Sequence, residues 1–200
     1  MPNLDFFLYV VHGAFWCSFG ITRLLTRPTN SGTTAFRDAP VSVEEGTAPF
    51  ARSLVLVHFA AFLVMYAGMG IAIMPKRVPD WFPGQRIAGT FAIALGAGLV
   101  SWAVAHFSSW RFQARLDRGH ELATRGPFRI MRHPIYMGLN LLALGTAIWI
   151  PSALVWVSVL LMAIGGDLRA RAEEKILMTA FGNRCSDYFE NTKRFVPGIY

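Results

Sequence analysis

Two polar segments of this sequence combine residue types that can bind a charged ligand. The first, GHELATRGPFRIMRHPIYMG at positions 119–138, holds two histidines, three arginines and two prolines. Pro134 suits the first turn of a helix, which would place Arg132 and His133 at a helix N-terminus, where free backbone N–H groups favour anions. The segment is therefore a candidate binding site, and an arginine-rich loop at a membrane surface is the alternative.

The second segment, DLRARAEEKILMTAFGNRCSDYF at positions 167–189, carries charges at helical spacing. Glu173 and Glu174 follow Arg169 by four and five residues, so one side of a helix would hold all three. On a solvated surface such a pair contributes only tenths of a kcal/mol. These carboxylates lie just beyond an apolar run that ends at Gly166, however, and carboxylates near lipid are costly without a partner. The pattern predicts a partner from another segment.

Composition points to a membrane protein. Of 200 residues, 54% are hydrophobic and 16% are charged, whereas soluble domains average about 25% charged residues. The net charge of +7 suits an anionic membrane surface, because the basic residues lie beside apolar runs. We expect no nucleic-acid partner, since no basic face or DNA-binding motif is found. Two cysteines give no disulfide framework.

Apolar runs at 6–22, 53–74 and 87–108, of 17, 22 and 22 residues, are long enough to span a membrane as helices. Small residues four apart, as at Gly68/Ala72 and Ala92/Gly96, allow close helix packing. The first run lacks a preceding basic segment, so we interpret it as a retained span rather than a cleaved signal.

The fourth apolar region, 135–166, is 32 residues long and contains Pro151. Because proline breaks helices, we expect a hairpin of two short helices at 136–150 and 152–166. Ser152 would cap the second helix. The predicted fold is an all-α, polytopic integral membrane protein with five transmembrane helices, the last two forming this hairpin.

The basic residues predict the orientation. With five spans, the first connection, the third connection and the C-terminal tail lie on one side and hold four, six and six Lys or Arg. The second connection, which holds three, faces the other side. The positive-inside rule then places the N-terminus outside and the C-terminus in the cytoplasm, in the inner membrane if the protein is bacterial. We expect one membrane domain over 1–200, with three spans in 1–108 and the site in 109–200.

The two polar segments together resemble the isoprenylcysteine carboxyl methyltransferase family and its phospholipid methyltransferase relatives. The first family pattern is G-H-x-L-x-x-x-G-(P)-[YF]-x-x-x-R-H-P-x-Y, met here by Gly119, His120, Leu122, Gly126, Pro127, Phe128, Arg132, His133, Pro134 and Tyr136. The second is R-x-x-x-E-E-x-x-L-x-x-x-F-G-x-x-Y-x-x-Y, met by Arg169, Glu173, Glu174, Leu177, Phe181, Gly182 and Tyr188. Cys185 replaces its first tyrosine, and KRFVP at 193–197 is similar to the family's closing segment.

This resemblance implies S-adenosyl-L-methionine as cofactor, S-adenosyl-L-homocysteine as product and no metal. The implied cofactor-binding residues are His120, Leu122, Thr124, Gly126, Pro127, Phe128, Arg132, His133, Pro134, Tyr136 and Glu173. The implied catalytic residues are Arg169 and Glu174. Arg169 would hold an acceptor carboxylate and Glu174 would hold Arg169 in place. With an amine or thiol acceptor, Glu174 would help to remove a proton.

The methyl acceptor stays open at this point. Carboxyl O-methylation of an isoprenylcysteine-like or other lipophilic acceptor, entering from the bilayer among membrane lipids, is the leading reaction. The alternatives are N-methylation of an aminophospholipid, S-methylation of a thiol and a non-catalytic haem-binding or transport protein. His58 and His106 would ligate a haem, line the acceptor site or, like His12, form hydrogen bonds between helices.

Overall fold

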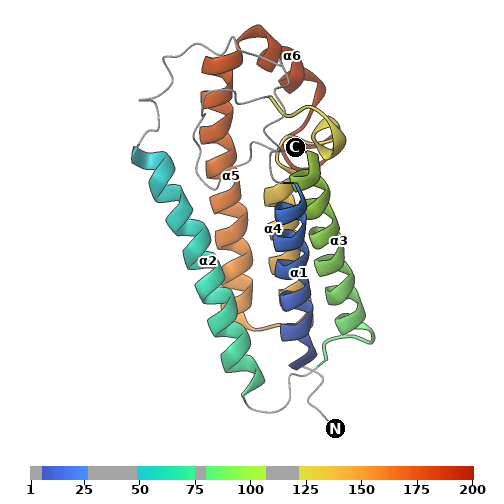
Figure 1. Cartoon of the computed structure of the whole chain (residues 1–200). Helices are drawn as coiled ribbons and strands as arrows, with labels where there is room; N and C mark the ends of the chain where they lie inside the picture. The colour runs from blue at the N-terminus through green and yellow to red at the C-terminus, as the bar shows by residue number, and fades with distance from the viewer. Residues whose placement is uncertain (1–5, 27–48, 75–79, 107–121) are drawn as a thin grey trace.

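The computed structural model describes residues 6–26, 49–74, 80–106 and 122–200. In this part the elements are α1 (Phe6–Leu25), α2 (Pro49–Ile73), α3 (Gln85–His106), the short 3-10 helix η2 (Gly126–Arg129), α4 (Pro134–Trp149), α5 (Ala153–Phe181) and α6 (Asn183–Asn191). The helices α1 to α5 lie side by side and alternate in direction, and α6 follows at the end where α5 finishes (Figure 1). The predicted all-α architecture is confirmed.

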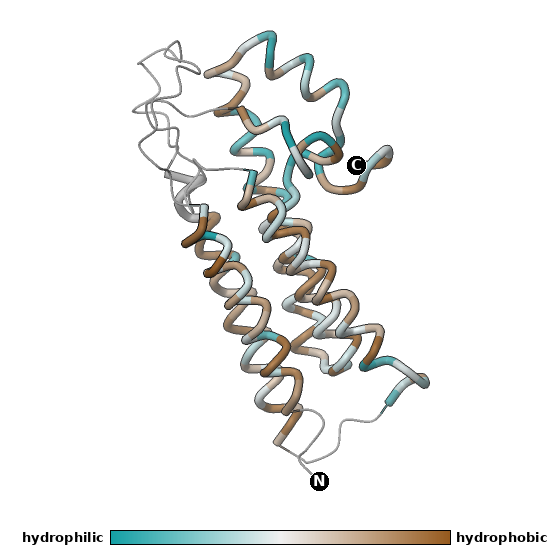
Figure 2. The backbone as a smooth tube through the Cα atoms, turned by 45° about the vertical axis from the view of Figure 1, so that its right-hand side comes forward, coloured by the Kyte–Doolittle hydropathy of each residue, from teal (hydrophilic) through white to brown (hydrophobic). Residues whose placement is uncertain are grey.

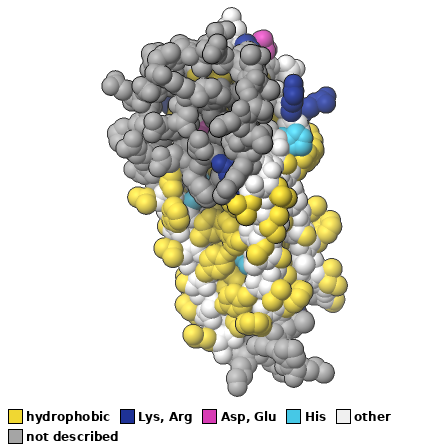
Figure 3. All heavy atoms as spheres, viewed as in Figure 1, with side chains coloured by type: hydrophobic (Ala, Val, Ile, Leu, Met, Phe, Trp, Pro, Cys, Tyr) yellow, Lys and Arg dark blue, Asp and Glu magenta, His cyan; other side chains and the backbone are white. Residues whose placement is uncertain are grey.

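The protein is a polytopic membrane protein. Four helices are long and apolar enough to cross a membrane: Phe6–Leu25, Leu54–Ile73, Gln85–His106 and Ala153–Phe181. The fifth, α4, is apolar but has 16 residues, about 24 Å, against a hydrocarbon core of about 30 Å. Hydrophilic residues gather at the end of the bundle that carries α6 and the C-terminus (Figure 2). On the face shown in Figure 3, hydrophobic side chains are spread along the described helices, and Lys or Arg side chains appear near the upper end.

The turn at Pro151 separates α4 from α5, as the sequence predicts. Ser152 precedes α5 in an extended conformation, but its side chain makes no capping hydrogen bond, so that expectation was wrong. Instead of ending near Gly166, α5 continues to Phe181 as one helix of 29 residues. The reason is local, because the residues after Gly166 are mostly Ala, Arg, Glu, Leu and Met, which favour helix. Residues 167–181 of the second segment thus continue the helix of a span, and its last residues belong to α6 (Asn183–Asn191).

Helices α3 and α4 touch through glycines seven residues apart. A Cβ atom at Gly96 would lie 2.6 Å from the carbonyl oxygen of Gly138, and one at Gly145 would lie 2.6 Å from that of Gly89. Any larger residue would force the two backbones apart. The close contact predicted for Gly96 is confirmed, and it fixes the position of α4, whose first turn carries the site.

Helices α2 and α5 make a similar contact at two levels. A Cβ atom at Gly68 would lie 2.9 Å from Cβ of Leu154 and 3.1 Å from the backbone nitrogen of Val155. Closer to the polar end, a Cβ atom at Gly165 would lie 3.0 Å from Val57. The prediction for Gly68 is confirmed, and α2 is held against the span that continues into the second segment.

A buried polar chain ties α1 to α2 and α4. The Trp16 indole donates to the Tyr66 hydroxyl at 2.7 Å, and that hydroxyl lies 3.1 Å from His12 Nδ1. His12 Nε2 is 2.9 Å from the Thr146 hydroxyl, which donates to the Leu142 carbonyl at 2.6 Å. One direction of donation satisfies all of these groups if His12 carries its proton on Nε2. His12 therefore has the interhelical role considered for it.

Candidate active site

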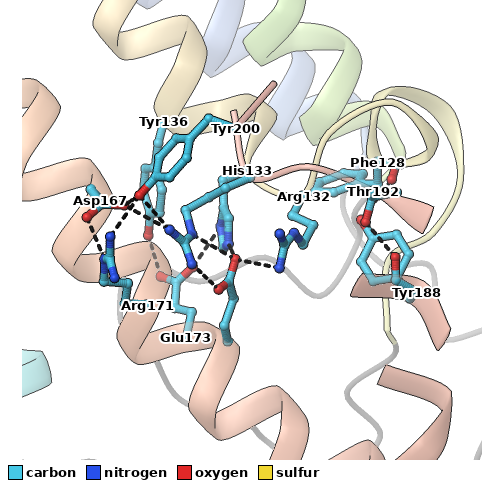
Figure 4. Close-up of polar contacts among 12 residues, drawn as sticks. Phe128, Arg132, His133, Tyr136, Asp167, Arg171, Glu173, Tyr188, Thr192 and Tyr200 are labelled. Carbon is cyan, nitrogen blue, oxygen red and sulfur yellow. Dashed lines mark hydrogen bonds and ion pairs between the residues drawn. The ribbon is translucent and has the colours of Figure 1, made fainter. Parts of the chain in front are cut away.

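The two polar segments meet at the end of the bundle. Pro134 starts α4 and His133 precedes it, as predicted. His133 Nε2 lies 3.2 Å from Glu174 Oε1, and Arg132 Nη1 lies 3.2 Å from the same oxygen. His133 and Glu174 are both buried. The RHP sequence thus supplies the partner that the acidic pair of α5 requires, and Figure 4 shows Arg132 and His133 in this cluster.

The C-terminal tail completes the binding of Glu174. The backbone N–H groups of Arg132 and His133 donate to the carbonyls of Lys193 and Arg194 at 2.8 and 3.0 Å, so the tail runs beside the RHP segment. Arg194 then donates to both Glu174 oxygens, from Nε at 3.0 Å and from Nη2 at 2.7 Å. The hydrogen bonds to Glu174 raise the pKa of Arg194 above its usual value.

Sequence reasoning assigned no role to a second polar group around Tyr200. The Tyr200 hydroxyl donates to Asp167 at 2.8 Å and accepts from Arg171 and Arg194 at 2.8 and 2.7 Å. Asp167 also pairs with Arg171 at 2.6 Å and with Arg194 at 3.1 Å. The similarity of KRFVP to the family's closing segment was the signal that the tail contributes to the site (Figure 4).

Tyr136 lies at the centre of an aromatic and charged stack. Its hydroxyl donates to Glu173. The His133 ring stacks on it at 5.6 Å with an interplanar angle of 10°, and the Arg169 guanidinium lies 5.0 Å from the ring centroid. Arg169 Nη2 lies 3.8 Å from Glu173 Oε1. An arginine over an aromatic face is a favourable cation–π arrangement.

Arg169 is therefore beside Glu173, whereas the partners of Glu174 come from other segments. Residues four apart lie about 40° apart around a helix, whereas residues five apart lie about 140° apart. Glu174 consequently points towards α4 and the tail, where it meets Arg132, His133 and Arg194.

The segment before α4 forms the predicted turn at 125–127. Gly126 has a φ of +59°, and a Cβ atom there would lie 2.6 Å from the His106 ring. Pro127 and Phe128 are buried in η2. The Tyr188 hydroxyl donates to the Phe128 carbonyl at 2.7 Å, which ties α6 to this turn. Burial raises the pKa of Tyr188, so the phenol stays protonated.

The structure brings six of the predicted site residues into one cluster: Arg132, His133, Tyr136, Arg169, Glu173 and Glu174. Leu122 is half-buried and Thr124 is exposed, both on the chain that leads into η2. His120 lies outside the described residues. Among the residues that the structure describes, no group of three or more His, Cys, Asp or Glu could hold a metal ion.

Cys185, which stands at a tyrosine position of the family pattern, is fully buried on α6. Burial, together with the charge of Glu174, raises the pKa of its thiol to about 11. A neutral buried thiol packs like a small apolar residue and is a poor nucleophile. The replacement thus supplies packing beneath the site rather than a hydroxyl group.

Fold and site together define a helical membrane protein with a buried charged cluster at one end of its bundle. Residues 85–184 match the phospholipid methyltransferase family, which is half of the chain, and the chain belongs to that family. The match runs from the start of α3 to the start of α6 and includes the first polar segment and residues 167–184 of the second. Members of the family are S-adenosylmethionine-dependent methyltransferases. A comparison with curated proteins gives no match.

Proposed function

We propose that this membrane methyltransferase methylates the carboxylate of a lipophilic, isoprenylcysteine-like acceptor. The observation that carries the proposal is the burial of Arg169. This residue is only 6% exposed and lies where the apolar span of α5 becomes polar. A buried arginine is suited to bidentate binding of a carboxylate. The two family patterns support the same choice.

The cluster has groups that fit S-adenosylmethionine, which supplies a methyl group on a cationic sulfur when bound. Arg132 Nε is buried and has no hydrogen-bond partner within the described part of the chain, so it can bind the cofactor carboxylate. Glu173, with a quarter of its side chain exposed, is the more open carboxylate for the cofactor ammonium. The stacked rings of His133 and Tyr136 suit the sulfonium. His120, Leu122, Thr124, Gly126, Pro127, Phe128 and Pro134 complete the proposed set.

The chain's own residues divide into two roles. Arg169 is the proposed catalytic residue, which holds the acceptor carboxylate in line with the methyl group. A carboxylate oxygen attacks the methyl carbon, the carbon–sulfur bond breaks and no proton moves. The family pattern implies a catalytic role for Glu174. Its contacts support a positioning role instead, in which it holds Arg132 and His133 in place. Its donors favour the ionised carboxylate, so Glu174 is poorly suited to remove a proton.

N-methylation of an aminophospholipid is the second candidate, and the name of the matched family favours it. That reaction requires a neutral amine, so a proton must leave the acceptor. Glu173 is the more exposed carboxylate for this role. S-methylation of a thiol would need a proton acceptor for the same reason. The family match favours all of these reactions over a haem-binding or transport protein.

We further propose that the site faces the cytoplasm, that the N-terminus lies outside and that residues 1–200 form one membrane domain. The basic side chains of the described site end support this orientation, because they include Arg125, Arg129, Arg132, Arg169, Arg171, Lys175, Arg184, Lys193 and Arg194. The acceptor would then enter from the bilayer, and the cofactor from the cytoplasm.

The test is methyl transfer from radiolabelled S-adenosylmethionine in lipid nanodiscs. N-acetyl-S-farnesylcysteine should acquire a base-labile methyl ester, and Arg169→Gln should abolish it, whereas Lys175→Gln, an exposed change on the same helix, should not. Base-stable label in phosphatidylethanolamine would overturn carboxyl methylation in favour of N-methylation. Absence of transfer to any acceptor, together with no S-adenosylhomocysteine binding by calorimetry, would overturn the enzyme.

A further inference from the structure

Two buried histidines within the spans have opposite surroundings. His12 is 2% exposed and both of its ring nitrogens have partners. His58, on α2, is 4% exposed, and among the described residues neither ring nitrogen makes a well-formed hydrogen bond, although the backbone of Leu54 lies within reach on the same helix. A buried polar group without a partner is costly and calls for an explanation by function. The interhelical role that explains His12 does not explain His58.

A second buried polar atom lies against the same stretch of α5. The side-chain oxygen of Asn140, on α4, is buried and has no hydrogen-bond partner among the described residues. Gly165 and Gly166 of α5 join the two residues, because a Cβ atom at Gly165 would lie 3.3 Å from His58 Nδ1 and one at Gly166 would lie 3.9 Å from Asn140 Nδ2. Two helices, α2 and α4, thus place these polar atoms against a stretch of α5 that presents only backbone.

Tyr136 connects this cluster to the proposed active site. The His58 and Tyr136 ring centroids are 5.5 Å apart. The same Tyr136 ring stacks with His133, lies under Arg169 at 5.0 Å and donates to Glu173. The Tyr136 ring therefore adjoins both His58 and the charged cluster that holds the cofactor-binding candidates, and Asn140 follows Tyr136 by one turn of α4.

We infer that His58 and Asn140 bind the headgroup of the methyl acceptor within the membrane, an inference that rests on the proposed methyl transfer. A neutral imidazole offers one donor and one acceptor, and the Asn140 oxygen offers another acceptor. A headgroup with an N–H group next to a carboxylate can pair with two of these groups, the imidazole N–H and the Asn140 oxygen. The carboxylate accepts from His58 with Arg169 nearby, and the N–H group donates to Asn140. These two residues then determine acceptor specificity.

The experiment compares two carboxylate probes in nanodiscs: N-acetyl-S-farnesylcysteine, which has the N–H group, and S-farnesylthiopropionate, which lacks it. His58→Phe should raise the acceptor KM for both probes by about tenfold or more, the usual effect of losing a hydrogen bond to a charged group. S-adenosylhomocysteine affinity should stay within about twofold of the wild-type value. Asn140→Leu should remove any preference for the probe with the N–H group.

Thermal unfolding separates this role from a structural one. His58→Phe should leave Tm nearly unchanged, because among the described residues no hydrogen bond to another helix is lost. His12→Phe is the matched control, and it should lower Tm because it removes the contacts with Tyr66 and Thr146. A lowered Tm in His58→Phe with an unchanged acceptor KM would overturn the inference.

Other outcomes distinguish the inference from the proposed function. If the wild-type protein transfers no methyl group, displacement of a photoreactive farnesylcysteine analogue still measures acceptor binding. Weaker displacement in His58→Phe would then support the headgroup site although carboxyl methylation had failed. Equal binding by wild type and variant, or loss of S-adenosylhomocysteine binding in the variant, would overturn the inference itself.

Discussion

Arg194 binds both carboxylate oxygens of Glu174, with Nη2 at 2.7 Å from Oε2 and Nε at 3.0 Å from Oε1. Glu174 also accepts contacts from Arg132 and His133 at Oε1. One carboxylate therefore joins the start of α4, the middle of the second polar segment and the C-terminal tail. The tail is a structural part of the site.

Arg194→Lys should destabilise the protein by about 2 kcal/mol, because lysine cannot form the two parallel hydrogen bonds of a guanidinium and a buried pair is weakened. Thermal unfolding in detergent micelles measures the effect. Lys193→Gln is the control, since the Lys193 side chain is exposed. Equal Tm values for wild type and Arg194→Lys would show that the tail does not stabilise the site.

The contribution of the tail illustrates what the sequence can and cannot predict. The RHP segment, the acidic pair and the break at Pro151 are local patterns, and each determines local structure through helix capping or periodicity. The pairing of Glu174 with Arg194 joins residues of α5 and the tail. It depends on how α6 returns the chain, and no periodicity encodes that path.

Arg132→Gln should weaken S-adenosylhomocysteine binding by about tenfold, because a charged donor to the cofactor carboxylate is lost. Isothermal titration calorimetry measures the affinity. Arg129→Gln is the matched control in the same segment, and its exposed side chain predicts no change. If the two variants bound the product equally well, Arg132 would have no part in cofactor binding.

Glu174→Gln and Glu173→Gln should differ in stability. Glu174 is 8% exposed among three donors, so its neutralisation leaves two partly buried arginines without this counter-charge and should cost about 3 kcal/mol. Glu173 is more open and its Arg169 contact is longer, at 3.8 Å, so its neutralisation should cost about 1 kcal/mol. Chemical unfolding in mixed micelles tests the order, and the reverse order would contradict the assigned roles.

The register on α5 shows a second limit of sequence reasoning. The R-x-x-x-E-E spacing predicts that one glutamate faces Arg169. Helical geometry favours Glu173 as that partner, whereas the family resemblance suggested Glu174. Only the position of α4, held by its glycine contacts with α3, shows that Glu174 meets Arg132 and His133. The surroundings of His58 could not be predicted from the sequence either, because hydrogen-bond partners depend on the packing of helices that are distant in sequence.

Gly126→Ala should destabilise the turn before α4 by about 1–3 kcal/mol, because an alanine is strained at the observed φ of +59°. The new Cβ atom would also lie 2.6 Å from His106. The double variant Gly126→Ala/His106→Ala should recover part of the loss by removing the ring, and thermal unfolding of both variants measures this. No recovery would mean that backbone strain alone accounts for the effect.

We predict that ionisation of the Cys185 thiol lowers the unfolding free energy of the protein at alkaline pH. Its thiol pKa is about 11 in the folded protein, whereas an unfolded chain titrates near about 8.5. Between these values the folded state holds the proton and the unfolded state releases it, so the unfolding free energy falls as pH rises. Relative to Cys185→Ala, the wild-type protein should therefore lose stability from about pH 8.5 towards 11. In a Cys17→Ser background, slow reaction of Cys185 with N-ethylmaleimide at pH 8 provides a second check. Rapid labelling, or parallel pH profiles for the two proteins, would show that the thiol is not held neutral by burial.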